Sequence, residues 1–166
     1  MYYKADMINI EKAKDALNNN FIMHSTDTLN SLSADATSDN CIQKVIDFKN
    51  RGGPFSIILN SINNIFEYAE INSNQFKLIK QLLPGPFTVL LKAKNSNLSK
   101  LVTEDSNLIG IRIPNHKFTL NLIEKFKNPI ITTSLNKTGE QPISNLKKIA
   151  KIYPDILIFD DKKKKE

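Results

Sequence analysis

Hydrophobic positions along the chain fall into short runs typical of strands and longer stretches with the helical period. The helical spacing of apolar residues predicts helices at residues 10–17, 62–69, 74–83 and 116–126, and two more that begin near residues 38 and 144. Short apolar runs predict strands at residues 21–24, 55–59, 87–91, 108–113, 129–133 and 155–159. No repeat of fixed period and no internal linker interrupts this alternation. The pattern therefore predicts one α/β domain with a largely parallel or mixed sheet.

Capping residues and helix breakers set the expected bounds of several helices. Ser38 or Asp39 is expected to cap the second helix, which ends at the sequence KNRGGP, residues 49–54. Ser73 and Ser144 are the caps expected for two later helices.

The composition bounds the size and class of the protein. The chain has 166 residues, of which 40% are hydrophobic and 24% are charged, which suits one domain with a buried core. No apolar run approaches the roughly 18–20 residues that span a bilayer. The N-terminus lacks the apolar stretch of a secretory signal. We therefore expect a soluble, cytoplasmic protein with no membrane contact.

Basic residues outnumber acidic ones. Lysine and arginine total 23 against 17 acidic residues, which gives a net charge of +6. This excess favours anionic partners such as nucleotides, phosphorylated metabolites or RNA. Four of the lysines form a run at residues 162–165, which is typical of a solvated tail. An AT-rich genome, which favours Lys, Asn and Ile, is an alternative explanation for much of the charge.

Common catalytic signatures are absent from the sequence. It contains no GxGxxG, GxxxxGK[ST], GxSxG or HExxH motif, which excludes the usual dinucleotide, P-loop, hydrolase and zincin mechanisms. The single cysteine, Cys41, allows no intramolecular disulfide and is expected to be a small core residue. His24 and His116 have no Cys or paired carboxylates at ligand spacing, so neither is expected to be a catalyst or a metal ligand.

Polar segments that flank predicted strands remain as candidates for chemistry. Residues 25–28, STDT, follow one strand, and residues 132–139, TTSLNKTG, leave another. Lys49 and Arg51 stand two residues apart at a helix end. Arg112 is a charge inside an apolar strand, which is costly unless it is paired or faces a ligand. Because ligands of α/β sheets lie beyond strand ends, these segments could converge on one crevice.

Most of these segments also have a purely structural interpretation. The segments at residues 25–28 and 132–139 are compatible with hydrogen-bonded Ser/Thr or Asx turns. Lys49 and Arg51 are compatible with partners of the helix dipole. The residues alone leave both interpretations open.

Five motifs, taken in order, resemble the YrdC-like family, the threonylcarbamoyl-AMP synthases that begin the formation of threonylcarbamoyladenosine in tRNA. The resemblance covers nearly the whole chain, about residues 9–159. The family motifs P-T-D/E-T-x-Y-G-L, K-x-R-P, W/L-P-G-P-x-T, V-x-V-R-x-P-x-H and T/P-S-A-N-x-S-G correspond to STDTLNSL (25–32), KNR with PF (49–51 and 54–55), LPGPFT (83–88), IGIRIPNH (109–116) and TSLNKTG (133–139).

The sequence departs from the family pattern at positions close to the expected ligands. Ser25, Asn30 and Ser31 replace the family's Pro, Tyr and Gly in the first motif, and Gly52 replaces the Pro of K-x-R-P. The loop at residues 51–54 is shorter than usual, and the family's S-T-I/V-V-D strand has no counterpart after the last predicted strand.

The resemblance implies a fold and an activity. The fold is a single-domain twisted sheet of parallel and antiparallel strands flanked by helices, over residues 9–160, with a lysine-rich tail at 161–166. Family members join L-threonine, bicarbonate and ATP, with Mg²⁺ bridging the phosphates, and release pyrophosphate without a covalent enzyme intermediate. Such chemistry requires positioning and charge neutralisation more than a nucleophile.

The resemblance also implies partners and an alternative. A downstream threonylcarbamoyl transferase would take the product, and contact with tRNA is a further expectation. The alternative is a YrdC-like RNA- or nucleotide-binding protein without synthase activity, which the altered first motif and the basic excess favour.

Four residues are expected to bind ATP by this resemblance. Lys49 and Arg51 would cradle the triphosphate, because a cation pair offsets the charge that gathers on the leaving pyrophosphate. Ser134 and Asn136 would bond the α-phosphate, the ribose or the threonine.

Four further residues are expected to bind threonine. Thr26 and Thr28 would line its pocket, together with Thr132. Arg112 would face the carboxylate of threonine or of its carbamate, in a bidentate geometry that lysine cannot copy. Asp27 would have a minor role in orienting the hydroxyls or a metal-bound water.

Overall fold

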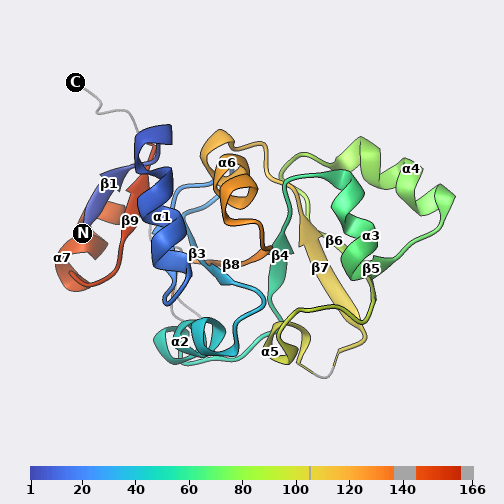
Figure 1. The fold of residues 1–166 in the computed structure, drawn as a ribbon, viewed down its shortest axis with the longest axis horizontal. Helices are drawn as coiled ribbons and strands as arrows, with labels where there is room; N and C mark the ends of the chain where they lie inside the picture. Colours follow the sequence, from blue (N-terminus) through green and yellow to red (C-terminus); the bar gives the residue numbers. More distant parts are fainter. Residues whose placement is uncertain (105, 137–144, 162–166) are drawn as a thin grey trace.

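A mixed sheet with helices on both faces organises the chain (Figure 1). The computed structural model describes residues 1–104, 106–136 and 145–161, and within these the sheet has nine strands in the order β1-β9-β2-β3-β8-β4-β7-β6-β5. Three neighbouring pairs, β1–β9, β2–β9 and β4–β7, are parallel, and the other five are antiparallel. The expected mixed α/β fold is therefore confirmed.

The elements have the following bounds in the described residues. The strands are β1 (Tyr2–Lys4), β2 (Ile22–His24), β3 (Ser31–Asp35), β4 (Ser56–Ile58), β5 (Ala69–Glu70), β6 (Val89–Ala93), β7 (Leu108–Arg112), β8 (Ile130–Ser134) and β9 (Ile158–Asp160). The α-helices are α1 (Ile10–Leu17), α2 (Asp39–Lys49), α3 (Ile65–Tyr68), α4 (Ser73–Leu82), α5 (Lys100–Thr103), α6 (Lys117–Phe126) and α7 (Leu146–Ile152), and the short 3₁₀ helices are η1 (Met7–Asn9) and η2 (Ile62–Asn64).

Most predicted elements are confirmed, and one cap is corrected. The helix predicted at residues 62–69 is divided into η2 and α3, and Ala69 belongs to β5. Helix α1 has the predicted bounds, and Ser38 caps α2 by accepting a hydrogen bond from the backbone of Cys41. Ser73 does not cap α4. The cap is Asn72, because its side chain reaches two backbone N–H groups and forms a capping box with Gln75. The predicted cap Ser144 lies outside the described residues.

Three strands were not predicted from the hydrophobic pattern. Strand β3 is buried along its whole length between β2 and β8, although three of the five residues in its sequence SLSAD are polar. Strand β1 precedes the expected domain start at residue 9 and pairs with β9, close to the other end of the described chain. Strand β5 has two residues at the sheet edge.

The two faces of the sheet are covered by different helices. Figure 1 shows α1 and α6 on one side of β3 and β8, and α2 and α5 on the other. The α1 and α6 side holds a smaller apolar cluster, in which Ile22, Ile58 and Ile130 of the strands meet Leu17 and Leu122 of the helices. The larger cluster, on the other face, includes residues of α2, α3, α4, α5 and α7.

Two single residues lie deep in the core. Cys41 is fully buried, as expected for a small core residue. His24 is also fully buried and has hydrogen-bond partners at both ring nitrogens. Among the helices in the described ranges, none has the length and apolar character needed to cross a membrane.

Candidate functional site

The loop that follows β2 carries the first group of candidate residues. The Thr26 hydroxyl donates to the carbonyl of Leu29 at 2.7 Å and accepts from the backbone N–H of Thr28 at 3.2 Å. This is the Ser/Thr turn that the structural interpretation anticipated. The turn brings the side chains of Asp27 and Thr28 to Arg112.

Arg112 ends β7 and joins this loop to the sheet. One guanidinium nitrogen donates to the Thr28 hydroxyl at 2.9 Å, and another forms an ion pair with Asp27. The other carboxylate oxygen of Asp27 accepts from the backbone N–H of Asn115 at 2.9 Å. The side chains of Arg112 and Asp27 are only 12% and 13% exposed, so water screens this pair weakly.

Arg112 retains an unused donor. Its Nε is buried and has no hydrogen-bond acceptor among the described residues. A buried donor without an acceptor costs about 1–3 kcal/mol, and a carboxylate oxygen is a strong acceptor for it.

The end of β8 carries the second group of candidate residues. The buried Lys49 amine at the end of α2 donates to the carbonyls of Ser134, at 2.7 Å, and Asn136, at 3.1 Å. The Ser134 hydroxyl donates to the amide oxygen of Asn136 at 2.5 Å. Burial lowers the pKa of Lys49, and the charge of nearby Arg51 lowers it further. Lys49 therefore anchors the chain after β8 rather than the carbonyls of its own helix.

Strand register places further hydroxyl groups on one face of the sheet. Residues that pair directly across neighbouring strands share a face, and Thr132 pairs with both Ser33 and Ser56, while Ser134 pairs with Ser31. On the same register, Ile58 pairs with Arg112. The face of the sheet that α1 and α6 cover is therefore apolar at Ile22, Ile58 and Ile130. The same face carries a row of hydroxyls, formed by Ser31, Ser33, Ser56, Thr132 and Ser134.

Gly110 lets neighbouring side chains pack closely on this face at β7. A Cβ at this position would lie 2.6 Å from the Ser56 hydroxyl and 3.3 Å from the Thr88 methyl carbon. The side chains of Ser56 and Thr88 therefore pack directly over the buried backbone of Gly110, and only glycine fits at this position.

The structure brings together seven of the eight candidate residues in two hydrogen-bonded or register-paired groups. Thr26, Thr28 and Arg112 form the first group, and Lys49, Thr132, Ser134 and Asn136 the second. Register joins the two groups, since β3 directly follows the first loop and pairs with β8.

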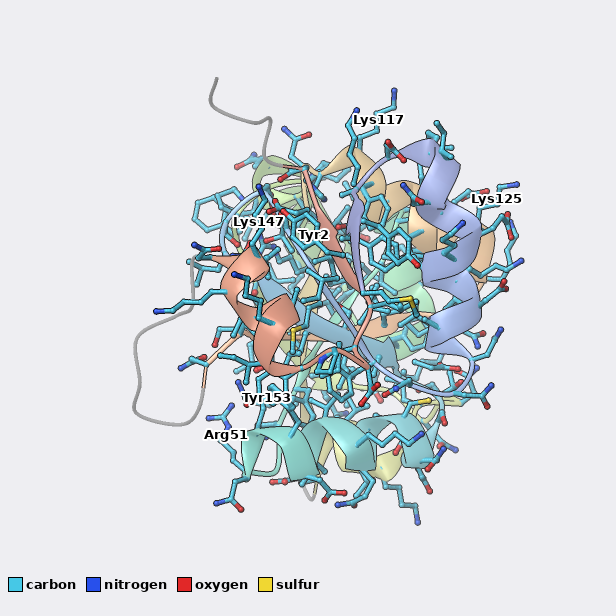
Figure 2. All side chains as sticks on the ribbon, turned by 90° about the vertical axis from the view of Figure 1, so that its left-hand side faces the viewer. Tyr2, Arg51, Lys117, Lys125, Lys147 and Tyr153 are labelled. Carbon is cyan, nitrogen blue, oxygen red and sulfur yellow. The ribbon has the colours of Figure 1, made fainter. Side chains whose placement is uncertain are left out.

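Arg51 is not part of either group in the described residues. It is exposed, and Figure 2 shows it at the end of α2, on the outside of the molecule. Residues 137–139, the rest of the last candidate segment, lie outside the described residues.

Sequence reasoning missed or undervalued several residues near the site. Asp27 received only a minor role, yet it is the ion-pair partner of Arg112. The serines of β3 and Ser56 were not considered for the site. For β3, the alternation of Ser31, Leu32, Ser33 and Ala34 was an available signal, because a period of two is typical of a strand.

A protein-based metal centre is not formed by the residues that the structure describes. They contain no group of three or more His, Cys, Asp or Glu side chains close enough to hold an ion.

The sequence is similar to a known protein family over most of its length. The Sua5/YciO/YrdC family model, described as telomere recombination, matches residues 16–165. A protein of Methanocaldococcus jannaschii, provisionally named a threonylcarbamoyl-AMP synthase, is 35% identical over 140 residues, which are 83% of this chain and 65% of that protein. The human threonylcarbamoyl-AMP synthase is 28% identical over 138 residues, 82% of this chain and 49% of that protein. The chain therefore spans about half to two thirds of the length of these relatives.

Solved structures show the same fold. The structure of P. abyssi Sua5 complexed with L-threonine superimposes with a TM-score of 0.85 at 23% identity, and covers 97% of this chain and 50% of that one. E. coli YciO gives a TM-score of 0.84 at 20% identity, with 98% of this chain and 83% of that one covered.

Proposed function

This chain belongs to the Sua5/YciO/YrdC family, and we propose that it is a threonylcarbamoyl-AMP synthase, a nucleotidyltransferase that acts in the threonylcarbamoyladenosine modification of tRNA. The amine of L-threonine would combine with bicarbonate to give a carbamate and water. A carbamate oxygen would then attack the α-phosphorus of ATP, and the bond to the departing pyrophosphate would break. Two relatives with this name or a provisional form of it, and the threonine bound in a structure of the same fold, support this assignment.

The observation that carries the proposal is the contact of the Thr26–Thr28 loop with Arg112. Two polar segments more than 80 residues apart meet at one end of a buried strand, at 2.9 Å between Arg112 and Thr28. Asp27 pairs with one guanidinium nitrogen, and the Nε–H of Arg112 still lacks an acceptor among the described residues. The carboxylate of threonine, or its carbamate, is the acceptor that we assign to this donor.

The nucleotide would lie along the end of β8. Ser134, Asn136 and Thr132 offer hydroxyl and amide groups to the α-phosphate, the ribose or the threonine. Lys49 and Arg51 would neutralise the triphosphate. Lys49 already donates to two backbone carbonyls, so its role in this proposal includes holding the shape of the site.

Magnesium would enter as part of the substrate. The phosphates of MgATP would supply ligands to the ion, as the resemblance to the family implies. When bound in this way, Mg²⁺ offsets phosphate charge.

The decisive experiment measures pyrophosphate release. We expect release that requires ATP, L-threonine and bicarbonate together, and that is lost in Arg112→Ala. Lys125→Ala is the matched control, because it removes an exposed cation on α6 that Figure 2 shows at the surface. Release that continues without threonine, or no release with all three substrates present, would contradict the proposal.

Contact with RNA is a second candidate function. Helix α7 exposes Lys147, Lys148 and Lys151, and Figure 2 shows Lys147 on the surface beside β1. This helix adds to the net charge of +6. The chain would either bind RNA or nucleotide without synthase activity, or act as a synthase that also contacts tRNA before its product passes to the threonylcarbamoyl transferase. In both cases, contacts with the phosphates would provide the affinity for RNA. Binding should then weaken steeply with salt and survive in Arg112→Ala, and binding that is indifferent to salt would exclude this candidate.

A further inference from the structure

Ser25 begins the loop that carries Thr26, Asp27 and Thr28, and its polar groups are held by hydrogen bonds. It is 3% exposed. Its N–H donates to the carbonyl of Phe159 at 3.0 Å, and its carbonyl is 2.8 Å from the Nδ1 of His24. Its hydroxyl donates to the carboxylate of Asp160 at 2.9 Å. Ser25 is thus bound on three sides, immediately before the residues that reach Arg112.

Asp160 at the end of β9 is a buried carboxylate that the proposed reaction does not use. It is 8% exposed and also accepts a hydrogen bond from the Tyr2 hydroxyl at 2.5 Å. Burial and the contact with Asp160 raise the pKa of Tyr2, so this hydroxyl stays protonated and remains a donor. A buried carboxylate is costly unless hydrogen bonds compensate it, and two hydroxyl donors do so, Tyr2 from β1 and Ser25 from the loop after β2.

His24 completes the attachment of Ser25 from the side of β2. A carbonyl can only accept, so His24 Nδ1 carries the proton that bonds Ser25. Nε2 then accepts from the Ser33 hydroxyl at 2.8 Å. Burial lowers the pKa of His24 to about 4, so the ring is neutral near pH 7 and keeps this arrangement.

The position of Ser25 in the first motif explains why these hydrogen bonds are needed to hold its backbone. Proline stands here in the motif that the sequence resembles, and proline fixes the backbone φ angle by its ring. Serine has no such constraint. Hydrogen bonds to Asp160, Phe159 and His24 restrict the backbone of Ser25 in its place, at the base of a short loop between β2 and β3.

We propose that Ser25 and Asp160 are positioning residues that hold the Thr26–Thr28 loop against Arg112 and so set the affinity for L-threonine. The part that concerns threonine rests on the proposed function. Asp160 acts through Ser25, which in turn fixes where Asp27 and Thr28 meet the guanidinium. Tyr2 donates to the same carboxylate from β1, outside the loop, which makes it a control.

The test compares Ser25→Ala with Tyr2→Phe. Each variant removes one hydroxyl donor to Asp160, but only the first cuts the link to the loop. We expect Ser25→Ala to raise the KM for L-threonine by about tenfold, the size of one hydrogen bond near a charged site, with the KM for ATP unchanged. Tyr2→Phe should leave both KM values unchanged. Ser25→Thr keeps the hydroxyl, so its KM for L-threonine should equal that of the wild type.

A second measurement is independent of activity. The backbone N–H of Asn115 and the guanidinium of Arg112 both bind Asp27, so their NMR signals report the loop position in the full chain without substrate. We expect both signals to shift or broaden in Ser25→Ala and to remain in place in Tyr2→Phe. A folded chain that releases no pyrophosphate would refute the proposed function, while these signals would still decide the positioning role.

Two results would overturn the positioning role. One is a Ser25→Ala variant with unchanged Asn115 and Arg112 signals. The other is an equal change in both variants, which would show that the cluster only stabilises the fold.

Discussion

The ion pair of Arg112 and Asp27 makes a prediction about a single residue. Asp27→Asn keeps the shape of the side chain but leaves the buried guanidinium without its counter-charge. We expect the free energy of unfolding to fall by about 3 kcal/mol, because breaking a buried pair leaves an uncompensated charge. Urea unfolding measures this loss.

An exposed pair provides the control for that measurement. Lys92 and Glu70 join β6 to β5, and their side chains are 63% and 55% exposed. Glu70→Gln should cost only about 0.5 kcal/mol, because water screens such pairs. Equal losses in Asp27→Asn and Glu70→Gln would mean that Arg112 is not dependent on Asp27 in the folded chain.

His24 makes a prediction about pH. Burial lowers the pKa of His24 from its ordinary 6.5 to about 4. As the pH falls, the unfolded chain therefore binds a proton before the folded chain does. The stabilising contribution is complete above pH 6.5 and is lost progressively down to about pH 4, which amounts to about 2 kcal/mol between about pH 7.5 and pH 5.

The pH dependence of unfolding in the wild type and in His24→Gln tests this assignment. The glutamine variant does not titrate in this range, so its stability should fall less between the two pH values. Parallel pH profiles for the two proteins would show that His24 is not the group responsible.

At the scale of residues, sequence reasoning identified Arg112 but not its partner. An arginine in the apolar strand at residues 108–113 is visible from composition alone, because such a charge needs a partner. Asp27 lies 85 residues away, and its contact depends on which strands are neighbours in the sheet. The same reason applies to Ser25 and Asp160, which are 135 residues apart.

At the scale of elements, Lys49 links helix α2 to strand β8. Its amine holds the carbonyls of Ser134 and Asn136, and its neighbour Arg51 is exposed. Lys49→Met should lower the free energy of unfolding without ligand by about 2 kcal/mol, because two bonds to a charged donor are lost. Arg51→Met is the matched control and should change it by less than about 0.5 kcal/mol.

ATP binding separates the two roles of these cations. If both residues neutralise the triphosphate, both variants should weaken ATP binding in calorimetry, although only Lys49→Met is destabilised. An Arg51→Met variant with wild-type ATP affinity would remove Arg51 from the proposed site.

Elements with strong local signals were predictable, and those defined by their neighbours were not. Helix α1 followed from its apolar period and α2 from its cap and terminal glycines. Strand β3 alternates in the manner of a strand, but its small and polar residues have little strand preference, so its pairing with β2 and β8 decides its conformation. The cap of α4 was misplaced by one residue because Asn72 and Ser73 are both good caps, and the capping box with Gln75 decides between them.

At the scale of the whole molecule, the sheet order explains where the site lies. Strand β9, near the end of the described chain, inserts between β1 and β2 and brings Asp160 beside the loop that follows β2. Helices α1 and α6 fill the apolar part of one face, and the row of hydroxyls on β3, β8 and β4 continues that face. The site thus draws on segments from both halves of the chain. Their flanking strands suggest that they converge, but the pairing of particular residues follows only from the strand order.

The position of β9 predicts that the sheet loses protection unevenly. Ile158 is fully buried and pairs with both β1 and β2, whereas Ile109 in β7 pairs with β6 at the far side of the sheet. Either residue changed to Ala should cost about 3 kcal/mol by leaving a cavity. Amide hydrogen exchange in Ile158→Ala should accelerate most in β1 and β2, and in Ile109→Ala most in β6, because local opening follows the strands that lose their neighbour. Uniform acceleration in both variants would instead mean that the nine described strands open as one unit.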